Sequence, residues 1–226
     1  MSITILAVAD QVDRLLYDHF RPERWRHIDL LLSCGDLPPD YLDFLCSSLD
    51  VPVLYVRGNH DAAYGADRYA GCENVHGKIV TYRGLRIAGF QGCRRYNNGD
   101  LQYTEAEMRH IVWRTKLRAL RTGPPHIVLA HAPPAGYHDS ADPCHRGFEC
   151  FTQLIHTWKP MCFMHGHVHA YERVEQVTQV GPTRVINPYP YRVIELPDPV
   201  PAPRAARSHR GKRSGRGIAN RLPLLH

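Results

Sequence analysis

Five polar clusters, each placed directly after an apolar run, constrain this chain more than any other feature. The apolar runs are typical of β-strands, and they are Ile3–Val8, Asp29–Leu32, Val53–Val56, Ile127–Leu129 and Met161–Met164. The clusters that follow them are Asp10, Gly35-Asp36, Gly58-Asn59-His60-Asp61, His131 and His165-Gly166-His167-Val168-His169. Because ligands bind outside the carboxyl ends of strands in open α/β sheets, we expect the five clusters to meet at one active site.

The side chains of these clusters indicate which ions the site would bind. Carboxylates, an Asn carbonyl and neutral imidazoles suit Mn, Fe, Zn or Co, whereas a thiolate site or an all-oxygen calcium site needs other ligands. A bridging Asp with ligands on both sides suits a pair of ions ~3.5–4 Å apart, which clamps the two oxygens of an in-line displacement. A phosphate ester is the natural substrate for such a pair.

In the order and content of these blocks, the chain resembles calcineurin-like metallophosphoesterases. The pattern of that family is Asp-x-His, Gly-Asp, Gly-Asn-His-Asp/Glu, a lone His and Gly-His-x-His, and four of the five blocks are intact here. The resemblance implies an α/β fold, namely a β-sandwich of two mixed sheets flanked by helices. It also implies an active site at the carboxyl ends of the strands.

The resemblance assigns a role to each matching residue. The first metal would bind Asp10, Asp36 and His169, and the second would bind Asp36, Asn59, His131 and His167. The implied cofactor is a pair of divalent ions, with Mn²⁺ as the first choice and Fe, Zn or Co as alternatives. His60 would protonate the leaving oxygen or stabilise the transition state, since the pKa of His lies near neutrality. Asn59 would also hold a phosphate oxygen. Plainer alternatives remain: His60 as a structural loop residue and His131 as an ordinary core histidine. His165, which matches no family ligand, would support the site or simply pack.

One block departs from the family pattern, because Val12 stands where the first-block His is expected. Val12 cannot bind a metal, so water or Asp13 would have to complete the first site. Purple acid phosphatases also lack this His and recover a ligand from a Tyr three residues after the bridging Asp. Here that position is Pro39, and Tyr41 is out of register. We therefore expect a first metal site that is weaker or differently selective.

The expected activity is metal-dependent hydrolysis of a phosphate ester by a metal-bridging hydroxide. Protein phosphatases of this superfamily extend Gly-Asp with a further Asp and then Arg-Gly, whereas this chain reads GDLPPDY. This difference favours a phosphodiesterase that acts on a small molecule or nucleotide. The alternatives are a phosphomonoesterase, a nuclease, or a non-catalytic scaffold that binds a protein partner, as a retromer subunit of this superfamily does.

Two loops are candidates for binding substrate, with ordinary loop polarity as the alternative for both. Residues 92–100 follow an apolar run and contain Arg94, Arg95 and Tyr96, which would hold phosphate oxygens and stack on a base or ring. Residues 137–148 follow the strand that precedes His131, and they contain His145 and Arg146 as a second pair for an anion.

The sequence between the blocks predicts the remaining elements. Helices are expected over 38–49, over 105–122 behind a Thr104/Glu107 capping box, and over a stripe from Phe148 to Trp158. A hairpin is expected over 78–90, with its turn at Arg83-Gly84. Further strands are expected over 171–180, 183–187 and 191–196.

Charge divides the chain into a domain over 1–198 and a basic tail over 199–226. The tail has seven Lys or Arg and no acid, so the formal charge of +6 falls to about −1 for the domain. Such a tail is typical of disorder, and it would serve either as an anchor for nucleic acid or anionic lipid or as a solubilising extension. Seven cysteines without metal or redox spacing, no signal-peptide pattern, and no apolar run near ~20 residues favour a cytoplasmic protein without a membrane span.

Overall fold

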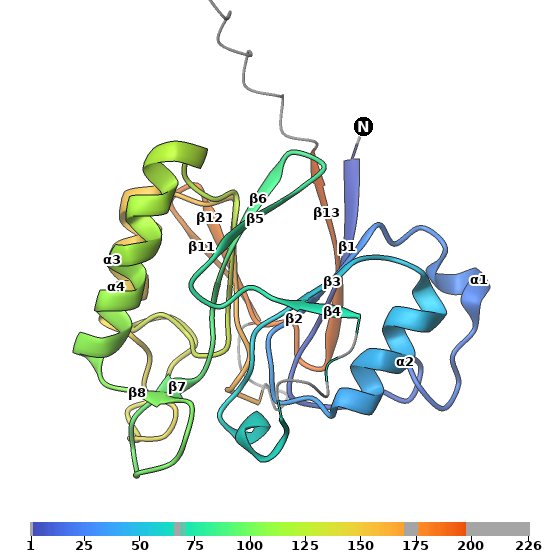
Figure 1. The fold of residues 1–226 in the computed structure, drawn as a ribbon, viewed down its shortest axis with the longest axis horizontal. Coiled ribbons are helices and arrows are strands. Elements are labelled where there is room, and N and C mark those ends of the chain that lie inside the picture. Colours follow the sequence, from blue (N-terminus) through green and yellow to red (C-terminus); the bar gives the residue numbers. More distant parts are fainter. Residues whose placement is uncertain (1, 66–68, 70, 170–175, 198–226) are drawn as a thin grey trace, which may run out of the picture.

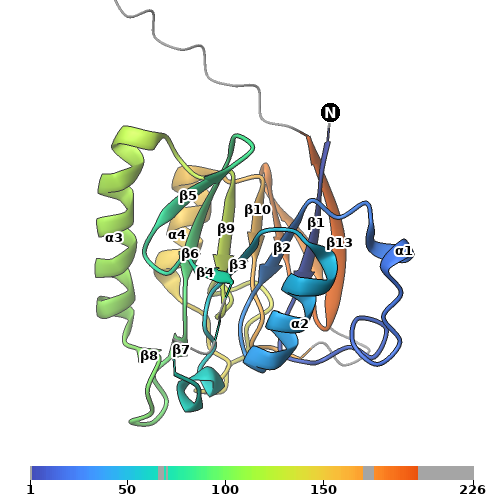
Figure 2. The ribbon, with the colours of Figure 1, turned by 45° about the vertical axis from the view of Figure 1, so that its right-hand side comes forward.

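The computed structural model describes residues 2–65, 69, 71–169 and 176–197. Two β-sheets pack face to face, and each has helices on its outer side (Figures 1 and 2). The first sheet lies against α1 (Pro22–Trp25) and α2 (Pro39–Leu49), and the second lies against α3 (Glu105–Thr122) and α4 (Glu149–Trp158). The predicted sandwich of two mixed sheets flanked by helices is confirmed.

The two sheets have the same plan, a parallel centre with an antiparallel edge. The first sheet has the order β13-β1-β2-β3-β4, and only β13 runs antiparallel to its neighbour. Its strands are β1 (Ser2–Val8), β2 (Leu30–Ser33), β3 (Val53–Tyr55), β4 (Cys72–Asn74) and β13 (Tyr191–Pro197). In the second sheet, of order β11-β12-β10-β9-β6-β5, the inner four strands are parallel. Its strands are β5 (Ile79–Tyr82), β6 (Leu85–Phe90), β9 (Ile127–Ala130), β10 (Cys162–Met164), β11 (Val177–Val180) and β12 (Thr183–Ile186).

The inner strands are continuously apolar because both of their faces are buried. In β9, Ile127 and Leu129 point into the core between the sheets, while Val128 faces the core under α3 and α4. In β1, Ile5 lies in the core between the sheets, and Leu6 packs toward α1 and α2. This burial explains why the sequence of these strands is a continuous apolar run and does not alternate between apolar and polar residues.

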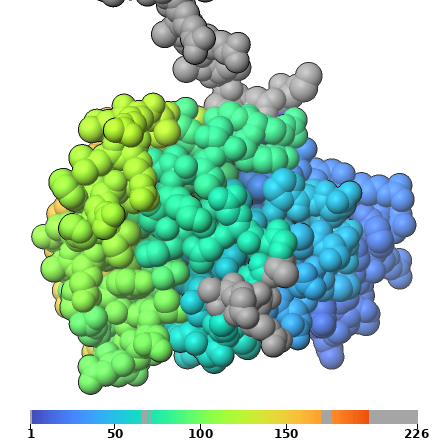
Figure 3. Space-filling model, in the orientation of Figure 1, coloured from blue at the N-terminus to red at the C-terminus, as the bar shows by residue number. Residues whose placement is uncertain are grey.

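Local sequence signals placed α2, α3, α4 and the hairpin correctly, whereas α1 was not predicted. Thr104 and Glu107 form the predicted capping box, and α3 ends at Thr122 before Gly123, whose φ of 87° suits glycine. The β5–β6 hairpin turns at Arg83-Gly84 with positive φ at both residues. In the space-filling view, the segment from β4 to β6 fills the surface between α3 and α2 (Figure 3). A two-stranded sheet of β7 (Cys93–Arg94) and β8 (Gln102–Tyr103) was not predicted.

Some predictions fall on residues that the structure does not describe. The strand expected over 171–180 is present only as β11, because 170–175 lie outside the described residues. The boundary at 198 and the tail over 199–226 lie outside them too, so both stay predictions. All seven cysteines are free thiols. Within the described ranges, no helix is long and apolar enough to span a membrane.

His76 gives the fold an expected sensitivity to acid. Burial lowers the pKa of His76 from 6.5 to about 4, and its Nδ1 accepts the Gln91 N–H at 3.1 Å. Between these two pH values the unfolded chain binds more protons than the folded one, so stability falls as pH falls from 6.5 through 4. Relative to His76→Gln, we expect the wild type to lose about 1–2 kcal/mol more between pH 7.5 and 4.5 in urea unfolding. Equal losses in both proteins would contradict this.

Candidate metal centre

The five polar clusters lie at one edge of the sandwich. The strands that precede them, β1, β2, β3, β9 and β10, all point their carboxyl ends toward this edge, where the 3-10 helix η1 (His60–Ala63) also lies (Figures 1 and 2). Backbone hydrogen bonds join the clusters across the two sheets. The Asp10 N–H donates to Gly35 O at 3.1 Å, and the Gly166 N–H donates to His131 O at 2.9 Å.

Three residues of these clusters have a backbone conformation that is uncommon for residues other than glycine. Asp10, Asp36 and His167 have φ values of 64°, 55° and 68°. Such left-handed residues turn a strand abruptly and are costly unless their surroundings hold them in place. Here all three are candidate metal ligands, and each directly follows a strand of the sandwich or lies in the segment after it.

Asp36, Asn59 and His131 form the centre of the site. His131 Nε2 lies 3.3 Å from Asp36 Oδ2 and 3.1 Å from Asn59 Oδ1. The His60 N–H donates to Asp36 Oδ1 at 2.8 Å. Asp61 joins the two loops, since its Oδ2 accepts the Asp36 N–H at 2.9 Å and the Gly58 N–H at 2.7 Å.

Backbone carbonyls fix the orientation of the two buried histidine rings. His131 Nδ1–H donates to Cys34 O at 2.8 Å, so Nε2 is the nitrogen that faces the site. His167 Nε2–H donates to Cys144 O at 2.7 Å, which leaves Nδ1 as the atom with a free lone pair. Burial lowers the pKa of His167 to about 3, so its ring is neutral. Second partners of this kind are typical of metal-binding histidines.

A proton on His131 occupies the centre of the cluster. Burial would lower the pKa of His131, but the charge and hydrogen bond of Asp36 outweigh it and raise the pKa to about 9. Burial would likewise raise the pKa of Asp36, yet His131 and the N–H of His60 lower it to about 2. Nε2–H therefore lies between two oxygen acceptors, which is the position that a cation would take.

The other two carboxylates of the site, Asp10 and Asp61, have too little positive charge around them to keep their usual pKa values. Burial, with the neighbouring charge of Asp36, raises the pKa of Asp10 to about 7 and that of Asp61 to about 6. A buried carboxylate without a compensating cation shifts its pKa in this direction. Three carboxylates around one histidine thus make a site that favours further cations.

The donor atoms fit a divalent metal. One ligand atom each from Asp36, His131 and His167 lies within 4.8 Å of the others, and a carboxylate with two imidazoles suits a borderline metal ion. Glycines keep the space around these atoms open. A Cβ on Gly58 would lie 2.0 Å from Asp36 Oδ1, and one on Gly166 would lie 2.6 Å from Asp10 Oδ2.

The expected first metal site is less tightly assembled. Among the described residues, neither Asp10 nor His169 belongs to a three-residue cluster of that closeness. The Asp10 carboxylate accepts the His167 N–H at 2.9 and 3.0 Å, and the His169 ring stacks on Tyr189 with centroids 5.2 Å apart. Tyr189 in turn donates its hydroxyl to the side chain of Gln11.

The structure gives no ligand role to the residues beside the missing His. Val12 packs against the apolar core under α2, and Tyr41 is buried in that core. Asp13 Oδ1 accepts the Leu15 N–H at 2.8 Å, so it caps the next turn. Pro39 begins α2. Of the two completions expected from the sequence, Asp13 is thus already engaged in a local hydrogen bond.

The alternation of His165, His167 and His169 in the sequence predicts that the three side chains share one face of an extended segment, and this prediction is wrong. It assumed an extended segment, but the left-handed φ of His167 turns the chain. His165 Nε2 points to His138 Nδ1 at 2.9 Å, while His167 faces His131 with ring centroids 4.9 Å apart. The packing alternative for His165 is the one that its contacts support.

Both candidate arginines of residues 92–100 are already paired with carboxylates near the start of α3. Arg94 lies 3.4 Å from Glu105, and Arg95 lies 3.1 Å from Glu107. The partners are 11 and 12 residues apart in the chain, beyond the reach of a local sequence pattern. They make the two guanidiniums less available to a phosphate than the sequence indicates.

The other candidate substrate residues differ in how closely they approach the metal centre. The Tyr96 side chain contacts those of Asn59 and Cys144, and burial raises the pKa of its hydroxyl. The His145 ring lies 5.2 Å from that of His167, but its Nδ1 is 3.0 Å from Asp142. Arg146 is exposed.

Sequence reasoning missed two residues that shape the site. Cys144 acts through its backbone carbonyl, for which no side-chain pattern exists. Asn187 is buried at the end of β12, where its Nδ2–H donates to Val168 O at 2.6 Å. A polar residue directly after an apolar strand was the signal for Asn187, as it was for the other clusters.

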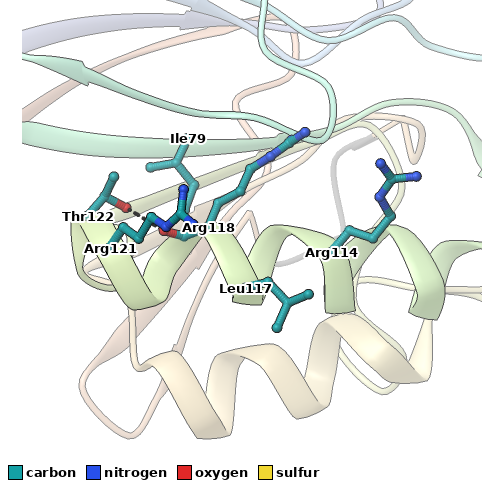
Figure 4. Close-up of a pocket in the computed structure, with 6 residues that line it drawn as sticks. All are labelled: Ile79, Arg114, Leu117, Arg118, Arg121 and Thr122. Atoms are coloured by element: carbon teal, nitrogen blue, oxygen red, sulfur yellow. Dashed lines mark hydrogen bonds between the residues drawn. The ribbon is translucent and has the colours of Figure 1, made fainter.

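A separate hollow of about 520 Å³ lies along α3 (Figure 4). Its lining residues are Ile79, Arg114, Leu117, Arg118, Arg121 and Thr122. The three arginines lie along the same side of the helix, and the Thr122 hydroxyl donates to Arg118 O at 3.3 Å. None of these residues belongs to the five clusters, so this hollow is distinct from the metal centre.

Comparisons with known proteins agree with this arrangement. A family model described as calcineurin-like phosphoesterase matches residues 8–171. One solved structure aligns at 18% identity and a TM-score of 0.60, over 88% of this chain and 100% of its own. The protein TT1561 of Thermus thermophilus aligns at 19% identity and a TM-score of 0.55, over 83% of this chain and 89% of its own.

A larger protein shares the fold as well. The 5'-nucleotidase from Candida albicans SC5314 aligns at 15% identity and a TM-score of 0.50, over 82% of this chain and 45% of the nucleotidase. At such identities the likeness concerns the fold alone. A search of curated proteins found no significant match. Since the family model covers the chain from the end of β1 to beyond His169, the protein belongs to the calcineurin-like phosphoesterase family.

Proposed function

We propose that this protein is a metal-dependent phosphodiesterase. The observation that carries the proposal is the cluster of Asp36, His131 and His167, whose donor atoms lie within 4.8 Å of one another beside two further buried carboxylates. Bound divalent ions would supply Lewis acidity, both for activating water and for neutralising charge on the phosphate. Asp36, Asn59, His131 and His167 would hold one ion, and Asp10, Asp36 and His169 the other.

The residues around the centre have distinct proposed tasks. Asn59 lies with its Oδ1 toward His131, so its amide nitrogen is left for the Tyr96 side chain or a phosphate oxygen. His60 is exposed at the start of η1, and its ring is close enough to Asp36 and His169 to affect the pKa of both. An exposed imidazole at this edge suits the transfer of a proton to a leaving alcohol.

The pairing of the nearby cations favours a diester over a monoester. A phosphomonoester carries a second negative charge, which calls for further cationic contacts. Arg94 and Arg95 are already occupied by Glu105 and Glu107. A diester with a single charge needs fewer of them. We therefore propose a small-molecule or nucleotide diester as the substrate class.

The assay that tests this function compares bis-p-nitrophenyl phosphate with p-nitrophenyl phosphate, using protein stripped of metal and then reconstituted with Mn²⁺. We expect Mn²⁺-dependent hydrolysis with a higher kcat/KM for the diester. A higher value for the monoester would favour a phosphomonoesterase. No hydrolysis with Mn, Fe, Zn or Co would favour the scaffold, in which Val12 marks a site that has lost its chemistry.

Replacing His60 by Ala is expected to lower kcat by about 10²–10⁴-fold, because a positioned proton donor contributes about that much. The loss should be larger for a nucleoside leaving group than for p-nitrophenol, which leaves without help. His19→Ala is the matched control, since His19 is also exposed but lies outside the five clusters. An equal loss for both leaving groups would show that His60 is not the acid.

A further inference from the structure

We propose that Asp142, Cys144 and His145 form a separate metal site, selective for Zn²⁺, on the loop that borders the metal centre. One ligand atom from each residue lies within 4.8 Å of the other two. The three residues occupy a four-residue stretch between β9 and α4. The described residues contain one other group of comparable closeness, which is the centre of Asp36, His131 and His167.

The backbone of this loop already holds the carboxylate in place. Asp142 Oδ1 accepts the N–H groups of Cys144 and His145, both at 3.0 Å. Asp142 Oδ2 remains 3.1 Å from His145 Nδ1. A metal ion would replace the proton that this nitrogen and the carboxylate share.

The thiol of Cys144 gives this loop a preference for Zn²⁺ that the metal centre lacks. A thiolate with an imidazole and a carboxylate suits Zn²⁺, whereas the hard Mn²⁺ favours oxygen ligands. The Tyr96 side chain contacts that of Cys144, and a fourth ligand or a water would be needed to complete a tetrahedral site. The predicted ligands of the metal centre include no thiol. The two sites would therefore differ in the ion that they select.

The position of the loop links the zinc site to the metal centre. The carbonyl of Cys144 accepts the His167 Nε2–H at 2.7 Å, and the His145 ring lies 5.2 Å from that of His167. Zinc held by Asp142, Cys144 and His145 would fix the Cys144 carbonyl and, through it, the orientation of His167. Zinc bound to this loop would thus set the orientation of His167, although His167 is not a ligand of the zinc.

Titration with Co²⁺, which takes the place of Zn²⁺, tests the proposal. Cobalt bound to a thiolate gives a charge-transfer band in the near ultraviolet, and cobalt on carboxylates and imidazoles does not. We expect the band in the full chain, and we expect Zn²⁺ to displace it. Cys144→Ser should abolish the band, and His145→Gln should weaken cobalt affinity at least about tenfold by removing one ligand.

Two controls make the outcome decisive. Cys46→Ser should keep the band, because Cys46 is a half-buried thiol on α2, beside Cys72 and away from the loop. Asp36→Asn should also keep it, so the zinc site is tested independently of the proposed activity. The absence of a band in the wild type, its persistence in Cys144→Ser, or its loss in Cys46→Ser would overturn the proposal.

Discussion

Replacing Asp36 by Asn is expected to abolish hydrolysis of phosphodiesters, with kcat falling by at least about 10³-fold. Asp36 is the carboxylate that both proposed metal ions share, and its Oδ2 lies 3.3 Å from His131 Nε2. The substitution keeps the shape of the side chain but removes its charge. The measurement is kcat for bis-p-nitrophenyl phosphate in the presence of Mn²⁺.

The matched control is Asp18→Asn. Asp18 is an exposed carboxylate that pairs with Arg14 at 3.6 Å, and surface pairs of this kind contribute little. The activity of the Asp18→Asn variant should equal that of the wild type. Because the Asn side chain carries no negative charge, the Asp36→Asn variant should also bind metal more weakly in calorimetry. Activity within tenfold of the wild type in Asp36→Asn would contradict the assignment of this residue.

Replacing Gly58 by Ala is the second change with a large expected effect. The added Cβ would lie 2.0 Å from Asp36 Oδ1 and 2.6 Å from His131 Cε1, distances that real Cβ atoms do not reach. Either Asp36 or the loop that carries Asn59 must move. We expect kcat/KM to fall by at least about 10²-fold, since displacements near 1 Å cost that much. Overpacking should also lower stability by about 1–3 kcal/mol.

Gly181→Asn is the control for this change. Gly181 lies in the turn between β11 and β12 with a φ of 57°, and a Cβ there would meet nothing within 4 Å. Asn tolerates a left-handed φ, so this variant should keep its activity. A Gly58→Ala protein as active as the wild type would show that the space beside Asp36 is not needed for catalysis.

The sequence predicted the framework well because its signals there are local. The Thr104/Glu107 capping box, the Arg83-Gly84 turn and the apolar strands each depend on residues that are neighbours in the chain. The meeting of the five clusters also followed, since it requires only that parallel strands end at the same edge. Those predictions are correct because each depends on a single local pattern or on a single rule of sheet packing.

The parts that could not be predicted depend on contacts between distant residues. The pairing of Arg94 with Glu105 brings the start of α3 against the β7–β8 segment, and nothing near Arg94 in the sequence indicates it. The left-handed backbone of His167 redirects His165 and His169, although the spacing alone suits a strand. The contact of Cys144 O with His167 involves a backbone atom, which every residue type has.

The central claim is that the strand-end cluster around Asp36 binds a pair of divalent metal ions. Anomalous scattering from crystals grown with Mn²⁺, collected near the manganese absorption edge, tests it most directly. We predict one peak about 2.0–2.2 Å from ligand atoms of Asp36, His131 and His167. A second, weaker peak should lie ~3.5–4 Å away, beside Asp10 and His169. No anomalous density next to Asp36 at saturating Mn²⁺ would contradict the claim.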